Sequence, residues 1–192
     1  MKPFADLVVR TRSCRRFQEA RRLDRVVLEG LLDMARQTPS AANRQPLRYL
    51  LVEGEAACAA VFPHLRWAAL LRDWTGPAAG ERPAAYVLVL ARTADGGLPQ
   101  CDAGIAMQTL LLAATEQELA GCMLGSLDRT RLAAACAVPA GHEILYAVAL
   151  GYPAERRVLE TAKDGDIGYY RDAAGVQHVP KRPLQEVLLG TR

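Results

Sequence analysis

Residues 102–114 read DAGIAMQTLLLAA, and this stretch carries the strongest information about the fold. Between residues 103 and 114 only Gln108 and Thr109 are polar. A helix that is apolar on nearly every face is a buried helix. In a chain of 192 residues we therefore expect a central helix that is covered on both sides, and a second copy of the chain is one way to cover the second side.

The segments around this helix alternate between strand and helix patterns. Short apolar runs predict strands at residues 49–52, 84–91, 120–127 and 143–150, the third of them ending in a loop. The run at 84–91, AAYVLVLA, is apolar throughout and predicts a buried strand. The order of elements favours an α+β or α/β fold with one sheet.

Three helical segments complete the pattern. The first follows Asp24, which is placed to cap it, and must end near Pro39. Its apolar residues share one stripe, at Leu28, Leu31, Leu32 and Ala35. Residues 55–74 predict a broken helix, followed by a loop at 76–80, and a short helix capped by Asp128 or Thr130 ends near residue 138.

The C-terminal residues 154–192 form a long polar tail without clear periodicity before residues 184–189. A long segment of this kind in a compact protein is often an arm over a partner subunit or a functional strap. We therefore expect one domain spanning residues 1–192, with residues 154–192 as a C-terminal arm that contacts the partner.

Composition excludes several classes of protein. The chain is 51% hydrophobic and 23% charged, which excludes a disordered chain. No apolar run reaches the roughly 18 residues that a membrane span needs, and the N-terminus lacks a signal-peptide pattern, so we expect a cytoplasmic protein. The net charge of +3 is too small to imply nucleic acid.

The five cysteines are widely spaced and include no CxxC motif. Neither a zinc site nor a disulfide framework is expected, and no metal site is predicted. Free thiols suit a reducing compartment. Cys14 lies among arginines that would lower the pKa of its thiol, so a reactive thiol there is an alternative to a plain core residue.

Four arginines and a serine lie within residues 10–16, RTRSCRR. Guanidinium groups bind phosphate or carboxylate through paired hydrogen bonds, and serine adds a hydroxyl donor. This segment therefore indicates an anion site. A solvated basic face is the alternative, and a nucleic-acid patch is weaker because no aromatic residues are interleaved.

Two further stretches carry polar chemistry. The loop at 38–46, TPSAANRQP, offers donors and acceptors between two stiffening prolines, although an ordinary turn would look the same. Lys181 and Arg182 follow Pro180, and two adjacent cations suit a phosphate, with a solvated tail as the alternative. GxSxG, HExxH and P-loop motifs are missing, and the three histidines lack metal-ligand spacing.

Together these stretches resemble the nitroreductase family of FMN-dependent oxidoreductases. The family's Pro-Ser-Ala-x-Asn-x-Gln-Pro motif matches at every defined position of residues 39–46, and its Arg-Ser-x-Arg stretch ending in Phe is similar to residues 12–17. Weaker matches follow in the family's order, at the helix beginning with Asp102 and at residues 121–126, 149–153 and 181–182. The chain is most similar to a compact, short branch of the family.

The resemblance implies an α+β fold with a central, mostly antiparallel sheet flanked by helices. It also implies an intertwined homodimer with two FMN molecules at the interface. Carried over residue by residue, Arg12, Ser13 and Arg15 would bind FMN, with Arg15 at the polar edge of the flavin ring. Lys181 and Arg182, together with Arg12, would hold the phosphate.

Further FMN contacts are implied from two other segments. The other chain of the dimer would contribute Pro39, Ser40, Ala41 and Asn43. The backbone of Leu124, Gly125 and Ser126 would meet the ring near N5. Thr11 stands where many relatives have arginine, so one phosphate contact would be weaker or would move to Arg10.

The implied activity is transfer of electrons from NADH or NADPH, through FMN, to an electron-poor acceptor such as a nitroaromatic or a quinone, in a ping-pong sequence. The flavin carries this chemistry, which explains why no catalytic triad is present. The loop between residues 92 and 102 is too short for the helical excursion that covers the substrate in longer relatives. Trp67 or Trp74 could line the substrate pocket, with core packing as the alternative for each.

Other functions remain open at this stage. The same fold and FMN site could serve reductive dehalogenation, azoline oxidation or a flavin-consuming reaction. A non-enzymatic flavin-binding protein is a second class, and an RNA-binding module at residues 10–16 is a third. Bound flavin colour would exclude the third class, and flavin reduction by NAD(P)H would separate an enzyme from a carrier.

Overall fold

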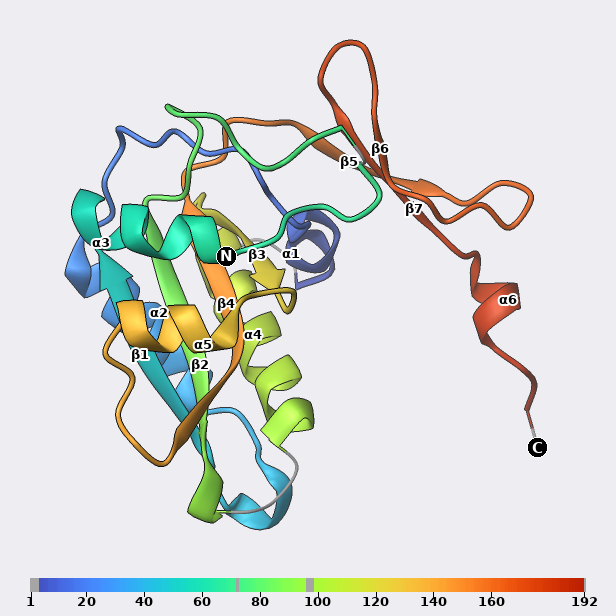
Figure 1. The fold of residues 1–192 in the computed structure, drawn as a ribbon. Helices are drawn as coiled ribbons and strands as arrows, with labels where there is room; N and C mark the ends of the chain where they lie inside the picture. The colour runs from blue at the N-terminus through green and yellow to red at the C-terminus, as the bar shows by residue number, and fades with distance from the viewer. Residues whose placement is uncertain (1–3, 72, 96–98, 192) are drawn as a thin grey trace.

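The computed structural model describes residues 4–71, 73–95 and 99–191. Its centre is a four-stranded sheet with the strand order β1-β2-β4-β3 (Figure 1). The strands are β1 (Leu47–Glu53), β2 (Ala85–Arg92), β3 (Ala120–Leu124) and β4 (His142–Gly151). Every neighbouring pair is antiparallel. The predicted α+β fold with a central antiparallel sheet is therefore confirmed.

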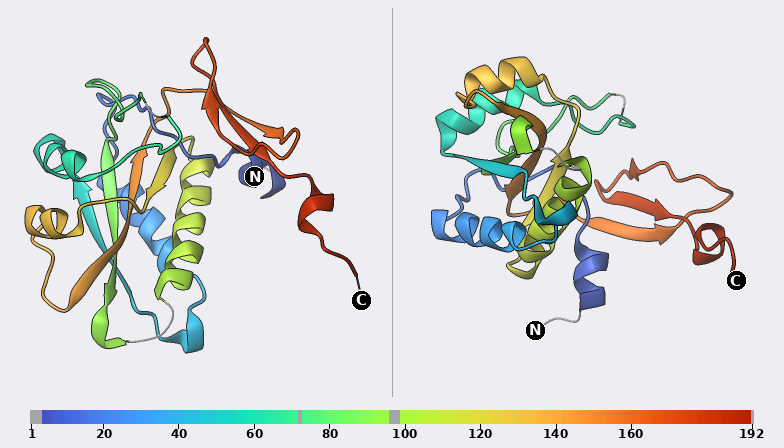
Figure 2. Two further views of the ribbon diagram at one scale, coloured as in Figure 1. Left: turned by 45° about the vertical axis from the view of Figure 1, so that its right-hand side comes forward. Right: turned by 90° about the horizontal axis from the view of Figure 1, so that it is seen from below.

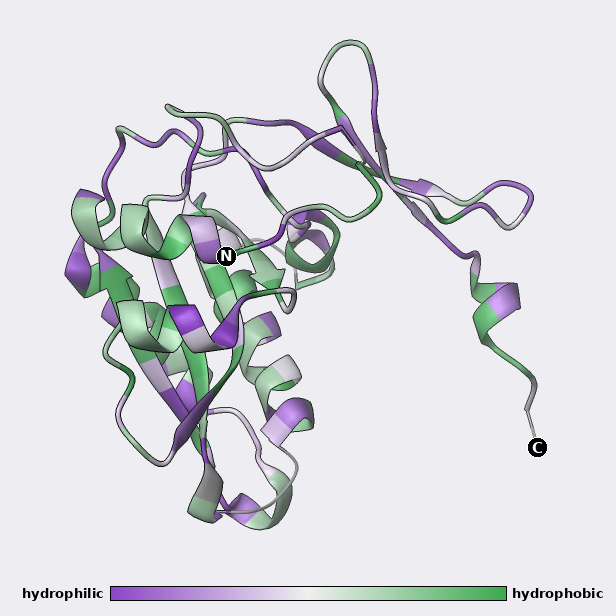
Figure 3. Ribbon diagram, viewed as in Figure 1, coloured by the Kyte–Doolittle hydropathy of each residue, from purple (hydrophilic) through white to green (hydrophobic). Residues whose placement is uncertain are grey.

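Helices cover both faces of this sheet (Figure 2). Tyr86 and Leu88 of β2 belong to a core that includes residues of α3 (Glu55–Val61) and α5 (Arg129–Ala135). Val87 and Val89 belong to a second core with α2 (Arg25–Arg36) and α4 (Pro99–Glu116). Successive strand residues point to opposite faces, so a strand with two covered faces is apolar throughout. Colouring by hydropathy shows the same apolar strands at the centre of the fold (Figure 3).

The helix boundaries follow from their capping residues and apolar stripes. Leu28 and Leu31 of α2 are fully buried, and Asp24 occupies the N-cap, although its side chain makes no capping hydrogen bond. Asp128 does cap α5, because its carboxylate accepts a hydrogen bond from the backbone of Arg131 at 3.1 Å. α4 extends beyond the predicted segment at both ends.

One side of α4 stays open in the single chain. Ala106 and Met107 pack into the second core, whereas Gly104 and Gln108 are exposed and Ile105 is 40% exposed. The expected cover is therefore present on one side of this helix. That a second copy covers the other side stays a prediction.

Three parts of the sequence-based prediction were wrong. α1 (Phe4–Arg10) was not predicted. The predicted helix over 55–74 consists of α3 and the short η2 (Phe62–His64), with no helix among the described residues from 65 to 74. The tail is not irregular, because β5 (Arg157–Thr161), β6 (Tyr170–Arg171) and β7 (Gln177–Lys181) form a second sheet.

This second sheet, which we call the arm sheet, projects away from the main sheet (Figures 1 and 2). β5 pairs with β7 in parallel, and β6 pairs with β7 in antiparallel fashion. α6 (Leu184–Val187) follows it. The strands are short and half-exposed, so they lack the apolar runs that marked the central strands.

Two expectations involve residues outside the described part of the chain. The short loop expected between residues 92 and 102 contains η3 (Thr93–Asp95) and the start of α4, but residues 96–98 are not described. Residues 1–3 of the N-terminal segment are likewise not described. In the part that is described, no helix combines the length and apolarity needed to cross a membrane.

Candidate functional site

A pocket of about 420 Å³ lies between the arginine-rich segment, α4 and the arm sheet. Its volume falls within the roughly 300–1,000 Å³ typical of ligand sites. The pocket is lined by Thr11, Arg12, Ser13, Arg15, Gln108, Leu111, Met123, Tyr169, Val179 and Lys181. Three of these residues are cations, and none of the described lining residues is acidic. We call this the arginine pocket, and its electrostatics favour an anionic ligand.

Arg12 and Arg15 both line this pocket. The Nε atom of each is buried and has no hydrogen-bond partner among the described residues. Arg12 Nη2 donates to the carbonyl of Val8 at 2.6 Å, and partial burial lowers the pKa of this guanidinium because the charged form loses water. A bound anion would offset that loss.

Contacts with three parts of the fold fix the arginine-rich segment. Thr11 Oγ1 donates to the carbonyl of Leu7 at 2.7 Å and lies within hydrogen-bond distance of Thr115 Oγ1 of α4, at 2.9 Å. The backbone of Cys14 donates to the carbonyl of Gly121 in β3 at 2.9 Å. Thr11 therefore anchors the segment to α4, in the place where relatives were expected to have an arginine.

Arg10 does not line the arginine pocket. Its guanidinium donates to Glu118 at 3.1 and 3.2 Å and also lies 3.5 Å from Asp6. It borders a different pocket, of about 270 Å³, together with Thr115 and Glu118. These carboxylates hold the Arg10 side chain outside the arginine pocket of this chain, so the alternative of a phosphate contact at Arg10 finds no support there.

Glu155 joins the arginine pocket to the arm sheet. Its side chain is 1% exposed, and Oε2 accepts a hydrogen bond from Arg171 Nη2 of β6 at 2.9 Å. Oε1 accepts from the backbone N–H of Arg15. The Arg15 guanidinium lies 4.9 Å from the ring centroid of Tyr169, which enters from the arm. No motif in the sequence marks Glu155, so sequence reasoning missed it.

The predicted C-terminal cations separate in the structure. Lys181 lines the arginine pocket. Arg182 does not, because its Nη1 bonds Glu186 Oε2 at 3.0 Å. In the single chain, therefore, Lys181 shares a pocket with Arg12 and Arg15, and Arg182 does not.

Leu124, Gly125 and Ser126 directly follow the pocket residue Met123 but do not line the pocket themselves. Leu124 is buried in the first core. The carbonyl of Gly125 accepts from Arg129 at 3.3 Å, and that of Ser126 accepts from the backbone of Arg66 at 2.9 Å. The predicted ring contact at these three residues stays a prediction.

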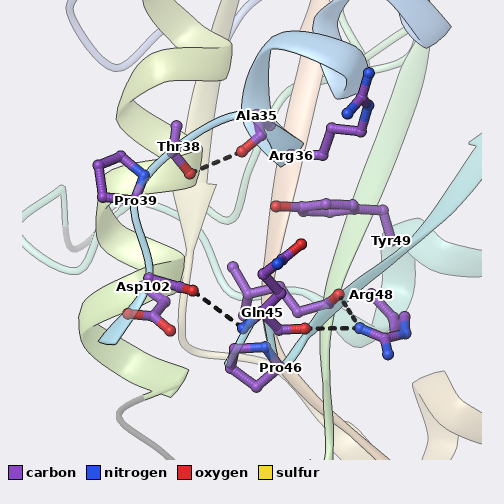
Figure 4. A pocket seen from close by; sticks show the side chains of 11 residues that line it. Ala35, Arg36, Thr38, Pro39, Gln45, Pro46, Arg48, Tyr49 and Asp102 are labelled. Atoms are coloured by element: carbon purple, nitrogen blue, oxygen red, sulfur yellow. Dashed lines mark hydrogen bonds between the residues drawn. The ribbon is translucent and has the colours of Figure 1, made fainter. Parts of the chain in front are cut away.

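Pro39 and Ser40 line a separate, smaller pocket of about 100 Å³, together with Tyr49 and Asp102 (Figure 4). Within this loop Ser40 Oγ accepts from the backbone of Gln45 at 3.0 Å. Asn43 Oδ1 accepts from Gln45 Nε2 at 3.1 Å. The polar side chains therefore hold the loop in shape, in addition to any contact with a ligand.

The backbone of this loop is strained. Ala42, Asn43 and Gln45 adopt left-handed conformations, with φ of 50°, 51° and 47°. Each such residue costs about 1–2 kcal/mol relative to the right-handed region. The segment 39–43, which includes η1 (Ala41–Asn43), therefore depends on contacts that hold it in place.

The two predicted halves of the site lie toward opposite ends of α4. The loop contacts Asp102 in the first turn, whereas the arginine-rich segment contacts Thr115 near the last turn. At a rise of 1.5 Å per residue these two positions are roughly 20 Å apart. The pocket beside the loop and the arginine pocket share no lining residue, so Pro39, Ser40, Ala41 and Asn43 do not line the arginine pocket of their own chain.

Cys14 is not a reactive thiol in this structure. It is fully buried, and burial raises the pKa of its thiol to about 12. The nearby Arg157 opposes this shift, but desolvation is the larger effect. The alternative of a reactive thiol at Cys14 was wrong, because desolvation outweighs the effect of the neighbouring arginine. Across the described ranges, no group of three or more potential ligands is arranged to hold a metal.

A family model described as the nitroreductase family matches residues 8–152. The chain belongs to the nitroreductase family. The match includes the arginine-rich segment, the loop at 38–46 and all four strands of the main sheet. A search of curated proteins found no match.

Solved structures share the nitroreductase fold. A nitroreductase family protein from Clostridium difficile 630 has a TM-score of 0.69 at 20% identity, over 100% of both chains. A protein from Desulfovibrio desulfuricans, described as a nitroreductase in complex with FMN, has a TM-score of 0.67 at 22% identity, over 100% of this chain and 98% of that one. An enone reductase of gut-bacterial fatty acid saturation has a TM-score of 0.68 at 15% identity, over 86% of this chain and 95% of that one.

Sequence reasoning missed several residues that line the arginine pocket of this nitroreductase family member. Gln108 had a visible signal, because it is one of two polar residues between residues 103 and 114. Met123 had none, because a methionine in a strand pattern reads as core. Of the two tryptophans, Trp67 is buried in the first core. Trp74 also packs against that core, but it is partly buried, contacts Arg171 and borders an open pocket.

Proposed function

We propose that this protein is an FMN-dependent oxidoreductase that passes electrons from NADH or NADPH to an electron-poor acceptor such as a nitroaromatic or a quinone. Membership of the nitroreductase family supports an oxidoreductase. The observation that carries the proposal is the arginine pocket, where three cations meet and two buried guanidinium Nε atoms lack partners among the described residues.

The residues of this pocket fit FMN. A phosphate dianion would accept charge-assisted hydrogen bonds from Arg12 and Lys181, and Ser13 would add a hydroxyl donor. Leu111 and Met123 provide apolar surface for a flavin ring. Arg15, held between Tyr169 and Glu155, would place a positive charge at the polar edge of that ring.

When bound, FMN supplies the hydride and electron transfer chemistry. The chain's own residues bind the cofactor, orient it and set the electrostatics around it. A cation at the ring's N1/O2 edge stabilises negative charge there, which is the role we assign to Arg15. A donor from the backbone of Gly125 or Ser126 would act at N5, as the family resemblance implies.

We further propose that two copies of the chain share each site. The loop with Pro39, Ser40, Ala41 and Asn43 is separated from the arginine pocket of its own chain, so a second copy would bring it there. The open side of α4 at Ile105 supports such an interface. So do the exposed apolar residues of α1, where Phe4 is 70% and Val9 is 52% exposed, and the projecting arm sheet.

The acceptor would enter beside Tyr169. The Tyr169 hydroxyl accepts a hydrogen bond from the backbone of Leu70 at 3.2 Å. Leu70, Trp74 and Arg171 line an open pocket of about 480 Å³ at this point. Trp74, rather than Trp67, is therefore the tryptophan that borders the proposed substrate side.

The experiment is an anaerobic visible spectrum of the purified protein with FMN, before and after NADH and then NADPH. We expect bound flavin that one of the two donors bleaches and that a nitroaromatic or quinone restores. Arg12→Ala should weaken FMN binding, whereas Arg10→Gln, two residues away and outside the pocket, should not. A protein that does not bind FMN would overturn the proposal. Bound flavin that neither NADH nor NADPH reduces would overturn the proposed activity and favour a non-enzymatic flavin-binding protein.

A further inference from the structure

Asp102 lies beneath the loop that carries the predicted flavin contacts, and its surroundings suit a specific role. Its Oδ1 accepts a hydrogen bond from the backbone N–H of Ala41 at 3.2 Å. Asp102 is 3% exposed, and its Oδ2 is buried without a partner among the described residues. This contact joins the first turn of α4 to the first residue of η1.

We propose that Asp102 is a positioning residue that holds segment 39–43 in place for the flavin bound by the partner chain. The inference rests on the proposed function, because it assumes that two copies share each FMN site. Asp102 is not placed in contact with the cofactor. It acts through the backbone of the loop.

The loop needs an acceptor that its own residues do not supply. The first N–H groups of a helical turn lack partners within that turn and are usually capped by the preceding side chain. Ser40 occupies this N-cap position, but its side chain makes no capping bond and instead accepts from the backbone of Gln45. Asp102 therefore provides the cap from a distant part of the chain.

A carboxylate is suited to this position. Asp102 lies in the first turn of α4, where the partial positive charge of the helix end stabilises an anion. A charged acceptor also bonds an N–H more strongly than a neutral one. Because three residues of the loop are in left-handed conformations, loss of this anchor would release the segment to other conformations.

The contact between Asp102 and Ala41 also sets the distance between the loop and the arginine pocket of the same chain. The same helix contributes Gln108 and Leu111 to the arginine pocket and holds the loop at its first turn. In a dimer with shared sites, each chain would bind one flavin through its arginine pocket and contact the partner's flavin through segment 39–43. One rigid helix, α4, would then fix the distance between these two parts of the chain.

The first test compares Asp102→Ala and Asp102→Asn, with FMN affinity measured by fluorescence titration. We expect Asp102→Ala to raise the Kd roughly tenfold or more, as for loss of a hydrogen bond to a charged group. Asn keeps an acceptor oxygen, so it should restore the Kd to within about threefold. Glu116→Ala, which removes an exposed acid from the same helix, is the control and should not change the Kd.

Two readouts separate positioning from a general loss of stability. The visible spectrum of bound FMN should shift in Asp102→Ala at saturating FMN, because the loop no longer meets the ring in one arrangement. A purely structural role would lower the melting temperature of the FMN-free protein and leave the spectrum unchanged. If Asp102→Ala does not fold, Asp102→Ser shortens the side chain away from Ala41 and should show the same loss of affinity.

The second test asks in which site Asp102 acts. A chain with Asp102→Ala is co-expressed with a differently tagged chain with Arg12→Ala, and the mixed dimer is purified. If Asp102 serves the partner's flavin, both defects fall in one site and the other is intact, so the mixed dimer binds about one FMN tightly. If Asp102 serves its own chain's flavin, each site carries one defect and neither binds tightly.

The outcomes are distinguishable from failure of the proposed function. Wild-type protein that does not bind FMN overturns both proposals. Tight binding by wild type with an unchanged Kd in Asp102→Ala overturns only the role of Asp102. A mixed dimer without a tight site overturns the action across the interface.

Discussion

Replacement of Glu155 by glutamine tests whether the arm sheet is tied to the arginine pocket. The carboxylate of Glu155 is 1% exposed and the Arg171 side chain 14% exposed, with 2.9 Å between Oε2 and Nη2. The other oxygen accepts from the backbone of Arg15. Glutamine has one acceptor oxygen, so one of these two donors would face an NH₂ group.

The magnitude follows from the burial of the pair. Removal of one partner of a buried ion pair costs about 3–5 kcal/mol, because the remaining charge is left without compensation. Glu155→Gln keeps the side-chain shape and one acceptor, so we expect a loss of about 3 kcal/mol. For a domain of this size that corresponds to a fall in melting temperature of roughly 6–12 °C.

The assay is urea unfolding of the FMN-free protein, combined with an FMN titration. Glu55→Gln is the matched control, since Glu55 pairs with Arg22 at 3.0 Å but is 83% exposed. That control should cost less than about 1 kcal/mol. The double variant with Arg171→Gln should lose less than the sum of the single variants, because the two side chains interact directly.

FMN affinity should fall several-fold in Glu155→Gln, because Arg15 loses the acceptor that holds its backbone. A free energy of unfolding within about 0.5 kcal/mol of wild type would refute the reasoning, since this size is typical of a surface substitution. So would additive single and double variants, which would show that Glu155 and Arg171 do not act as a pair.

Two further predictions concern titrating groups. Cys14 is buried with its thiol pKa raised to about 12, whereas Cys101 is exposed, so iodoacetamide near pH 8 should label Cys101 well before Cys14 by mass spectrometry, and equal labelling would contradict the structure. His178 lies between Glu160 at 3.0 Å and Asp172 at 3.1 Å, which raises the pKa of His178 and lowers that of Asp172. The contribution of His178 to stability is fully present below its unfolded pKa of 6.5 and is lost as the pH rises through its raised folded pKa. The contribution of Asp172 is present above its unfolded pKa of 3.8 and is lost as the pH falls through its lowered folded pKa. A plot of melting temperature against pH should therefore peak between the two unfolded pKa values, 3.8 and 6.5, and His178→Gln should flatten this profile.

The main sheet and α4 could be predicted because burial on both faces leaves a direct trace in the sequence. β2 has buried residues at almost every position, and a strand covered on both faces has no polar alternation. α4 is likewise apolar around most of its circumference. In both elements the pattern of apolar residues is the physical cause of the fold, so it can be read without the structure.

The arm sheet could not be predicted in the same way. Its strands are short and half-exposed, and its order is set by pairing between β5 and β7, which lie far apart in the sequence. Gln177 is fully buried there because its amide donates to the carbonyl of Tyr170. A polar residue with a partner can be buried, but the sequence does not name the partner.

The site was predicted at the level of motifs and not of contacts. Arg12, Ser13, Arg15 and Lys181 line one pocket, whereas their contacts with FMN stay predictions. Arg10 and Arg182 looked equally suitable by charge, but each is held by a carboxylate elsewhere. Cys14 shows the same limit, because the sequence reveals charged neighbours but not the desolvation that outweighs them.

The separation of Pro39 and Ser40 from the arginine pocket has a different origin. Both segments are held firmly within their own chain, one through Asp102 and the other through Thr115, at opposite ends of a single helix. Neither can cross that distance without breaking the contacts that shape it. If both segments bind one flavin, their convergence has to come from the association of two chains. The two motifs of one chain, the loop and the arginine-rich segment, would then belong to two different FMN sites. They are kept apart because α4 holds one near its first turn and the other near its last.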